Sequence, residues 1–359
     1  MNDMNKEKIK KFLIVDFSKR LTLGDQLKIM FEILFVSWIL FTLVYIVVLV
    51  RGHSDNGVPS SAETSQVSEV STVEPSQEQE PSETSVEQKI SNVFKETDTV
   101  SLGYDEIYKG DLILVNKQYP CHSDGEGTIP LMGVKSDSYM ATDYAVSLNE
   151  NIIGNLDDML DDFFEIYGES EVMIACGYRS RSNQEEIFAN EVEEVGEEEA
   201  VQWVARPGYS EHQTGLVFDF TLYNDSEQGS LKYDGTGIYS WINENSYKYG
   251  FILRYPLGKE EITGYNYESW HFRYVGLAAS YYINANGLTL EEYIQTVQKH
   301  KIDDPLLIDG GGENKWYVYY VPANENQTTQ VIVPTNVKYT VSGDNFSGFI
   351  VTSQVDIKG

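Results

Sequence analysis

The chain has 359 residues, of which 41% are hydrophobic and 13% aromatic. This length and composition allow two folded units and exclude a protein that is disordered throughout. Lys and Arg number 26 against 56 Asp and Glu, which gives a net charge of −30. Because proteins bind nucleic acids largely through basic side chains at the phosphates, this balance argues against nucleic acid as a partner. The two cysteines, Cys121 and Cys176, are too few for a disulfide scaffold, although a single bond between them stays open.

An apolar run over residues 33–50 is long enough to cross the hydrocarbon core of a membrane as a helix. Lysines are frequent before this run, and an acidic sequence follows it. The positive-inside rule therefore predicts cytoplasmic residues 1–30, a transmembrane helix over residues 31–51, and a single-pass protein of the cell membrane with the rest of the chain extracytoplasmic. A cleaved signal peptide and a buried core helix are the alternatives, but no small-x-small cleavage pattern follows Val50.

Residues 52–97 are predicted to be a disordered spacer. Between residues 54 and 88 the chain is mostly Ser, Glu, Thr, Pro, Gln and Val, without an aromatic residue, Leu, Ile, Lys or Arg. Such a composition buries too little apolar surface to offset the loss of chain entropy on folding, and its like charges extend it. The segment is expected to hold a folded domain away from the membrane.

Residues 98–304 have the pattern of a folded domain. Strands are predicted at residues 112–115, 172–176, 217–222 and 272–275, and helices at residues 156–167, 277–286 and 290–300. Gly287 is expected to end one helix, and Thr289 with Glu292 to cap the next. Ser182 and Glu185 have the spacing of a capping box and predict a further helix start. Strands and helices alternate without a βαβ rhythm, which predicts an α+β domain with a central antiparallel sheet.

Residues 305–359 are predicted to form a small β-rich C-terminal region. Short strand patterns separated by Asn, Gly and Pro occur at residues 316–321, 330–333, 337–341 and 349–351. A region of this size is too small for a large core of its own. Its aromatic residues fit either a glycan-stacking surface or, more commonly, the packing of a small sheet: Trp316, Tyr317, Tyr319 and Tyr320.

Two of the five histidines lie in segments that carry metal-binding chemistry. His212 belongs to YSEHQTGLVFD and His271 to YESWHFRY. A catalytic zinc needs three protein ligands of the His, Asp, Glu or Cys type and an open position. His212, Asp219 and His271 supply two imidazoles and a carboxylate, and a metal would offset the cost of burying Asp219 in an apolar strand. Each residue alone has commoner structural uses, so the prediction of zinc rests on the combination.

Three further residues suit the chemistry of peptide hydrolysis. Glu268 stands three residues before His271 and reaches the same site only if a turn precedes the strand. A carboxylate placed there could take a proton from water and pass it to a leaving amine. Arg179 and Gln184 lie near a predicted helix N-terminus, where an anionic substrate group is favoured. An ion pair between Arg179 and a neighbouring Glu is the alternative.

These segments resemble the VanY-type D-alanyl-D-alanine carboxypeptidases. The likeness rests on four motifs in the same order, namely GYRS followed by Gln184, S-x-H-x-x-G…D from Ser210, YGFILRYP, and E-x-W-H from Glu268. It covers roughly residues 111–290. It implies a zinc peptidase with the hedgehog/D-Ala-D-Ala-peptidase-like fold, which releases the terminal D-Ala from peptidoglycan stem peptides.

The resemblance also implies a role for each motif residue. His212, Asp219 and His271 match the zinc ligands, and Glu268 matches the general base that activates a zinc-bound water. The substrate-binding positions are matched by Arg179, Gln184 and Ser210. The family usually has Ala where Val217 stands, a difference that bears on substrate preference, and often has Pro where Ser269 stands, a difference that bears on the rigidity of the turn.

The expected partners are a peptidoglycan stem peptide and, through the N-terminal helix, the cytoplasmic membrane; a monomer without nucleic acid is expected. An L,D-carboxypeptidase or an endopeptidase on the same wall peptides would keep the fold and the ligands. A non-catalytic wall-binding module is the alternative from another class, and the presence of Glu268 favours an enzyme. The acidic run at residues 191–199 lacks the spacing of a calcium-binding loop and is expected to be a solvated helix.

Overall fold

The computed structural model describes residues 90, 93–168, 171–224 and 229–356. The predicted cytoplasmic segment, the transmembrane helix and nearly all of the predicted spacer lie outside these residues. Across the described ranges, no helix has both the length and the apolar character needed to cross a membrane. The described residues all belong to one structural unit, Glu78–Gly359.

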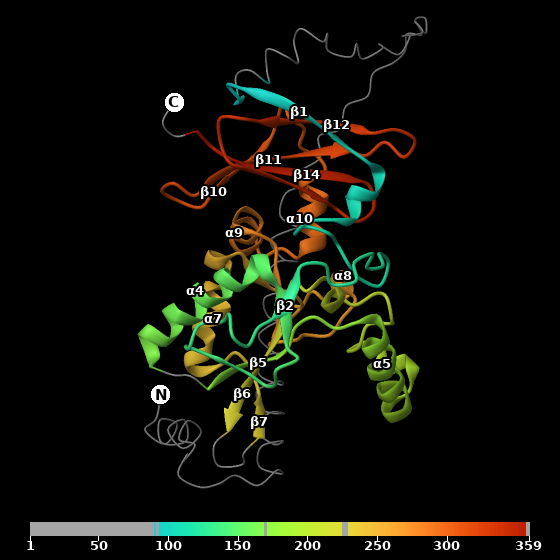
Figure 1. Cartoon of the computed structure of the whole chain (residues 1–359), viewed down its shortest axis with the longest axis vertical. Coiled ribbons are helices and arrows are strands. Elements are labelled where there is room, and N and C mark those ends of the chain that lie inside the picture. Colours follow the sequence, from blue (N-terminus) through green and yellow to red (C-terminus); the bar gives the residue numbers. More distant parts are fainter. Residues whose placement is uncertain (1–89, 91–92, 169–170, 225–228, 357–359) are drawn as a thin grey trace, which may run out of the picture. The chain divides into compact units, whose positions relative to one another are not determined.

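A mainly antiparallel sheet forms the centre of the fold (Figure 1). Its strands follow the order β3-β5-β6-β9-β8, and β7 pairs with β6 beyond this path. All of these pairs are antiparallel except β3 with β5. The predicted strands at residues 172–176, 217–222 and 272–275 are thus confirmed, the last shifted by one residue. The strands are β3 (Met140–Ala141), β5 (Val172–Cys176), β6 (Val217–Asn224), β7 (Gly229–Lys232), β8 (Phe251–Leu253) and β9 (His271–Tyr274).

Side chains along β6 alternate between the hydrophobic core and the opposite face of the sheet. Phe218 and Phe220 are buried in a hydrophobic cluster with Phe272 of β9. Asp219 lies between the two rings in sequence and therefore points to the opposite face. Helix α4 (Glu150–Tyr167) covers the core side with a buried stripe that includes Leu156. The predicted helix at residues 156–167 is confirmed, and it begins earlier, after the cap residue Asn149.

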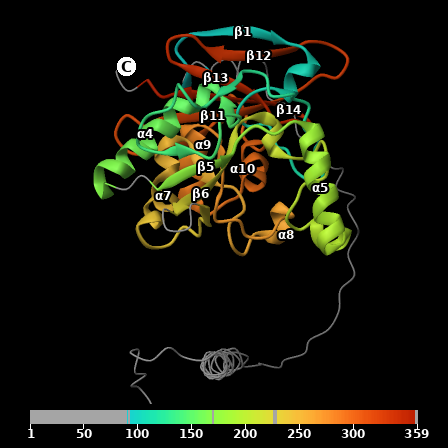
Figure 2. The same ribbon diagram turned by 60° about the horizontal axis from the view of Figure 1, so that its bottom comes forward.

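Helix α5 (Arg181–Val195) lies to one side of the central sheet (Figures 1 and 2) and continues into the short α6 (Glu197–Ala200). Its N-cap is Ser180, whose hydroxyl accepts the backbone N–H of Asn183 at 3.2 Å. The predicted cap at Ser182 is wrong by two residues, because Ser182 already lies inside the first turn. Glu185, its expected partner, instead lies 3.7 Å from Arg181 on the helix surface.

The predicted strand at residues 112–115 does not form. All four residues are buried, as a central strand would be. Their backbone groups, however, form no ladder with a neighbouring strand. They bond to side chains and, at Leu114, to a loop carbonyl, that of Asp344, at 3.1 Å. The Leu112 N–H donates to Ser342 Oγ at 2.9 Å, and the Ile113 carbonyl accepts from Arg273 Nη2 at 3.0 Å. The apolar run is therefore as buried as a strand, but its backbone N–H and C=O groups find hydrogen-bond partners outside any sheet.

The remaining elements before residue 277 are short. The helices are η1 (Tyr104–Tyr108), η2 (Glu211–Thr214), η3 (Gly237–Tyr239), α7 (Ser240–Asn245), η4 (Ser246–Tyr249) and α8 (Glu260–Thr263), and the strands are β2 (Thr128–Pro130) and β4 (Ser147–Asn149). Two longer helices follow β9, α9 (Leu277–Asn286) and α10 (Leu290–Val297). Gly287 ends α9 with a left-handed backbone, and Thr289 with Glu292 forms the predicted capping box of α10.

A second antiparallel sheet follows in the order β10-β11-β14-β13, and a separate pair joins β1 to β12. Strands β11, β13 and β14 of this sheet, together with β12 of the pair, confirm the four predicted strand regions. The bounds are β1 (Thr97–Leu102), β10 (Leu306–Asp309), β11 (Lys315–Pro322), β12 (Thr329–Pro334), β13 (Tyr339–Gly343) and β14 (Gly348–Gln354). Figures 1 and 2 show β1 and β12 beyond β11 and β14, on the side away from the helices.

The two faces of this sheet pack against different partners. Val318 and Tyr320 of β11 face the cluster formed with α9 and α10. Tyr319 lies between them and faces the cluster formed with β1 and β12, as strand alternation requires. Trp316, Tyr319 and Tyr320 are at most 9% exposed. Of the two alternatives for this aromatic run, packing of the sheet is therefore the one observed for these three residues.

Candidate active site

Two paired strands and a short helix bring the predicted metal ligands together. His212 lies in η2, and Gly215 then reverses the chain into β6 with a left-handed φ of 69°. Asp219 of β6 is the direct register partner of His271, the first residue of β9. Because register partners project from the same face, the carboxylate and the second imidazole meet without any further loop.

The Asp219 carboxylate faces both imidazoles. His212 Nε2 lies 3.3 Å from Asp219 Oδ2, and His271 Nδ1 lies 2.9 Å from Oδ1. The two rings are nearly perpendicular, at 85°, with centroids 5.1 Å apart. The other nitrogen of His212, Nδ1, lies 2.6 Å from the carbonyl oxygen of Gly177. Since that oxygen only accepts, Nδ1 donates its proton to it, and Nε2 is the nitrogen that faces Asp219.

Glu268 reaches the same place from the turn before β9. Its Oε2 lies 3.8 Å from His271 Nδ1, so the turn that the sequence analysis requires is present. Ser269, in the position where the resembling family often has Pro, donates its hydroxyl to the Tyr233 carbonyl at 2.7 Å and holds this turn. Burial raises the pKa of Glu268 to about 7, despite the opposing charge of His271. A carboxyl group with this pKa is suited to proton transfer near neutral pH.

Arg179 and Gln184 form a second part of the site, at the start of α5. Arg179 Nη1 donates to Gln184 Oε1 at 2.9 Å, and Gln184 Nε2 donates to the Ala205 carbonyl at 2.7 Å. Gln184 is fully buried. Among the residues that the structure describes, Arg179 forms no ion pair, so the alternative pairing with a Glu is not observed. The guanidinium charge is therefore available to an anionic ligand.

A single cavity of about 250 Å³ contains both parts of the site. All seven residues predicted from the sequence line it: Arg179, Gln184, Ser210, His212, Asp219, Glu268 and His271. Aromatic and apolar side chains complete the walls, among them Ile187, Trp203, Tyr255, Tyr265 and Trp270. A charged centre beside apolar walls is the usual composition of a small-molecule or peptide site.

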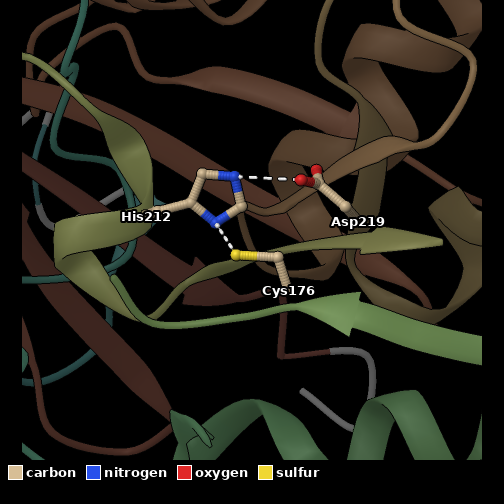
Figure 3. Close-up of side chains that lie close together, drawn as sticks. All are labelled: Cys176, His212 and Asp219. Carbon is tan, nitrogen blue, oxygen red and sulfur yellow. Dashed lines mark hydrogen bonds and ion pairs between the residues drawn. The ribbon is translucent and has the colours of Figure 1, made fainter. Parts of the chain in front are cut away.

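Cys176, at the end of β5, is a member of the site that sequence reasoning missed. Its Sγ lies 3.6 Å from His212 Nδ1 and accepts from Arg179 Nη2 at 3.2 Å. Figure 3 shows His212 between Cys176 and Asp219, and donor atoms of these three residues lie within 4.8 Å of one another. Both cysteines are free, so no disulfide joins Cys176 to Cys121. Its position directly before the GYRS motif is the signal that the sequence offers.

Glu211 was also missed, although it precedes His212 directly. Its Oε1 accepts from Arg254 Nε and from Arg273 Nη1, both at 2.9 Å. Arg254 also donates two hydrogen bonds to Glu291, at 2.7 and 2.9 Å, and both arginines are fully buried. Burial disfavours the charged carboxylate, but the two guanidinium groups hold the pKa of Glu211 well below its usual range. The sequence signal is an Arg in each of two apolar segments, Arg254 directly after β8 and Arg273 within β9, which requires a buried acid nearby.

Comparisons with known proteins agree with these features. The sequence profile of the VanY family, D-alanyl-D-alanine carboxypeptidase, matches residues 145–277. A D-alanyl-D-alanine carboxypeptidase of Enterococcus faecium is 33% identical over 270 residues, which cover 73% of this chain and 81% of that protein. The protein YodJ of Bacillus subtilis (strain 168) is 36% identical over 256 residues, which cover 69% of this chain and 90% of YodJ.

A solved structure also resembles this fold. The crystal structure of the vancomycin-resistance D,D-dipeptidase VanXYg, in complex with a D-Ala-D-Ala phosphinate analogue, superposes with a TM-score of 0.65. The two chains are 31% identical, and the match covers 72% of this chain and 99% of the other. The similarity therefore includes nearly the whole of that enzyme, not only the segments around the four motifs.

Proposed function

The chain belongs to the VanY family of D-alanyl-D-alanine carboxypeptidases, and from this membership we propose that it releases the terminal D-Ala from peptidoglycan stem peptides. One observation carries the proposal. A single cavity holds a His, Asp and His donor set, a carboxylate suited to proton transfer, and a guanidinium without an ion-pair partner among the described residues. Hydrolysis of a peptide next to its C-terminal carboxylate calls for these three functions.

The donor set fits a zinc ion. His212 Nε2, Asp219 and His271 Nδ1 offer two imidazole nitrogens and a carboxylate, a set that catalytic zinc takes together with one open position. The Gly177 carbonyl at His212 Nδ1 is the kind of bond that orients a metal-binding imidazole. This set is favoured over one containing Cys176, because Cys176 lies at the nitrogen that already donates to Gly177. A bound zinc ion supplies Lewis-acid chemistry for amide hydrolysis.

The other residues bind the peptide and move protons. Arg179, held by Gln184, binds the C-terminal carboxylate through charge-assisted hydrogen bonds. Glu268 takes a proton from the attacking water at a carboxylate oxygen and delivers it to the amine of the departing D-Ala as the C–N bond breaks. Ser210, buried in the cavity wall, offers a hydroxyl to the peptide backbone.

The test uses the zinc-loaded full-length protein with two synthetic stem peptides, a pentapeptide ending in D-Ala-D-Ala and the corresponding tetrapeptide. Free D-Ala from the pentapeptide is expected, with loss of release on treatment with a chelator and recovery when zinc is returned. Release of D-Ala from the tetrapeptide alone would instead indicate an L,D-carboxypeptidase. Absence of release from both peptides while zinc stays bound would overturn the proposal and favour a wall-binding role.

We also propose that residues 33–50 anchor the protein and that the catalytic domain acts outside the cytoplasmic membrane. The proposal is supported by the apolar run, the lysines before it and the acidic sequence after it. Membrane fractions should contain the full-length chain, and protease added to intact protoplasts should digest the catalytic domain. A protein recovered from the medium with a new N-terminus beyond Val50 would contradict the anchor.

A further inference from the structure

Two buried polar atoms beside the proposed zinc ligands have no hydrogen-bond partner, Glu211 Oε2 and His271 Nε2. They face each other at 3.6 Å. Glu211 is 2% exposed and His271 is 4% exposed, so bulk water does not satisfy these atoms. Buried polar atoms are nearly always paired, because leaving them unpaired is costly. The two atoms are therefore expected to act on each other.

The chemistry of the pair bears on which ring nitrogen of His271 carries the proton when a metal is bound. An ionised carboxylate can only accept, so the two atoms are complementary when His271 has its proton on Nε2. The other nitrogen, Nδ1, then holds the lone pair, and it is Nδ1 that lies 2.9 Å from Asp219 Oδ1. Both ring nitrogens face carboxylate oxygens, Nδ1 at Asp219 and Nε2 at Glu211. A zinc ion bound at Nδ1, as proposed above, would take the Nδ1 lone pair and leave the single ring proton on Nε2, opposite Glu211.

Glu211 is held so that it cannot turn away from the imidazole. Its Oε1 is bound by Arg254 and Arg273 at 2.9 Å each, which leaves Oε2 directed at His271. Arg273 is itself fixed by donation to two backbone carbonyls, those of Asp111 at 2.8 Å and Ile113 at 3.0 Å. Both guanidinium groups are fully buried and keep the carboxylate ionised.

We infer that Glu211 is a positioning residue for the metal centre: it accepts the Nε2 proton of His271 and thereby directs Nδ1 to the metal. The inference rests on the zinc ligation proposed above. It makes the two histidines bind through different nitrogens, each set by its outer partner. The Gly177 carbonyl selects Nε2 of His212, and the Glu211 carboxylate selects Nδ1 of His271.

The first test needs no change to the chain. The full-length protein is labelled with ¹⁵N-histidine and loaded with zinc, and the ring signals of His271 are assigned by their loss in His271→Gln. The inference expects a proton on Nε2 that exchanges slowly with solvent, and an unprotonated, metal-bound Nδ1. A proton on Nδ1 with the metal at Nε2 would overturn it.

The second test compares two buried carboxylates that bind the same arginine. Glu211→Gln should weaken zinc binding by about 10- to 100-fold, the usual effect of losing an outer partner of a metal ligand. Glu291→Gln removes the other acid bound to Arg254, has no contact with His271, and should leave zinc affinity unchanged. Equal losses in both variants would mean that Glu211 acts only as a counter-charge.

These tests are independent of peptidase activity. Zinc affinity is measured by competition with a chromophoric chelator, and D-Ala release is measured separately. A protein that binds zinc with the expected proton on Nε2 but releases no D-Ala would contradict the proposed function and leave the inference standing. If Glu211→Gln fails to fold, the ¹⁵N measurement on the unchanged chain decides.

Discussion

At the scale of single residues, a substitution of Glu268 distinguishes a role in proton transfer from a role in metal binding. Its carboxyl is buried beside the proposed ligands, and burial raises its pKa to about 7. Glu268→Gln keeps the size of the side chain but cannot accept a proton. We expect kcat to fall by about 10²- to 10⁴-fold, the usual contribution of general acid–base catalysis, while the zinc content stays the same. Steady-state D-Ala release and metal analysis on the same sample measure both quantities. Loss of zinc together with activity would make Glu268 a ligand.

A substitution of Arg179 tests whether its guanidinium binds the C-terminal carboxylate of the peptide. Arg179→Ala should lower kcat/KM by about 10- to 150-fold, because a hydrogen bond to a charged group contributes roughly 1.5–3 kcal/mol. Arg181→Ala is the matched control, since Arg181 lies two residues away and pairs with Glu185 on the exposed surface of α5. Its kinetics should match those of the unchanged protein. Similar losses in the two variants would indicate an effect on the start of α5 and not on substrate binding.

The three predicted metal ligands could be identified from the sequence alone. His212, Asp219 and His271 form a donor set with few other uses when they occur together, so residue type and motif context are sufficient. Cys176 and Glu211 could not be identified in this way. Their contacts depend on how β5, η2 and β9 pack, and only the folded structure gives the 3.6 Å distances from each of them to a histidine nitrogen.

At the scale of elements, the turn between β5 and α5 links backbone geometry to the proposed metal site. A Cβ atom on Gly177 would lie 2.2 Å from the Ser147 carbonyl oxygen, so any side chain must displace the turn. The Gly177 carbonyl also accepts from His212. Gly177→Ala should therefore weaken zinc binding and cost about 1–3 kcal/mol of stability, as overpacking usually does.

The control for this substitution is Gly154→Ala in α4. Gly154 is exposed, and a Cβ there would meet nothing within 4 Å. Because glycine is unfavourable inside a helix, this change should stabilise the protein by about 0.5–1 kcal/mol without affecting zinc affinity. Urea unfolding and zinc competition measure both variants. A Gly177→Ala protein with unchanged zinc affinity would contradict the role of its carbonyl.

The elements that the sequence predicts correctly carry their own boundary signals. Gly287 ends α9, and the Thr289 capping box starts α10, through contacts within a few residues. The two errors lie where distant or competing groups decide the outcome. The backbone of residues 112–115 bonds to Ser342 and Arg273, which are remote in sequence, and Ser180 takes the cap that the pattern assigns to Ser182.

At the scale of the whole molecule, the predicted boundary between residues 304 and 305 runs through a shared core. Leu290 and Ile294 of α10 belong to the same hydrophobic cluster as Val318 and Ile350 of the C-terminal sheet. Strand β1, which begins next to the predicted start of the catalytic domain, pairs along its whole length with β12. We therefore expect the catalytic and C-terminal parts to unfold in one cooperative transition.

A chain that ends at Asp304 tests this expectation. The truncation exposes several side chains of the shared cluster, each worth about 1.5–3 kcal/mol when buried, against a total stability of about 5–15 kcal/mol for a typical domain. The shortened protein should aggregate or unfold at a much lower temperature and bind zinc poorly, because β9 leads directly into α9. Calorimetry and zinc binding on the two forms provide the measurement. An unchanged unfolding temperature with full D-Ala release would instead establish residues 98–304 as an independent domain and the C-terminal sheet as an addition to it.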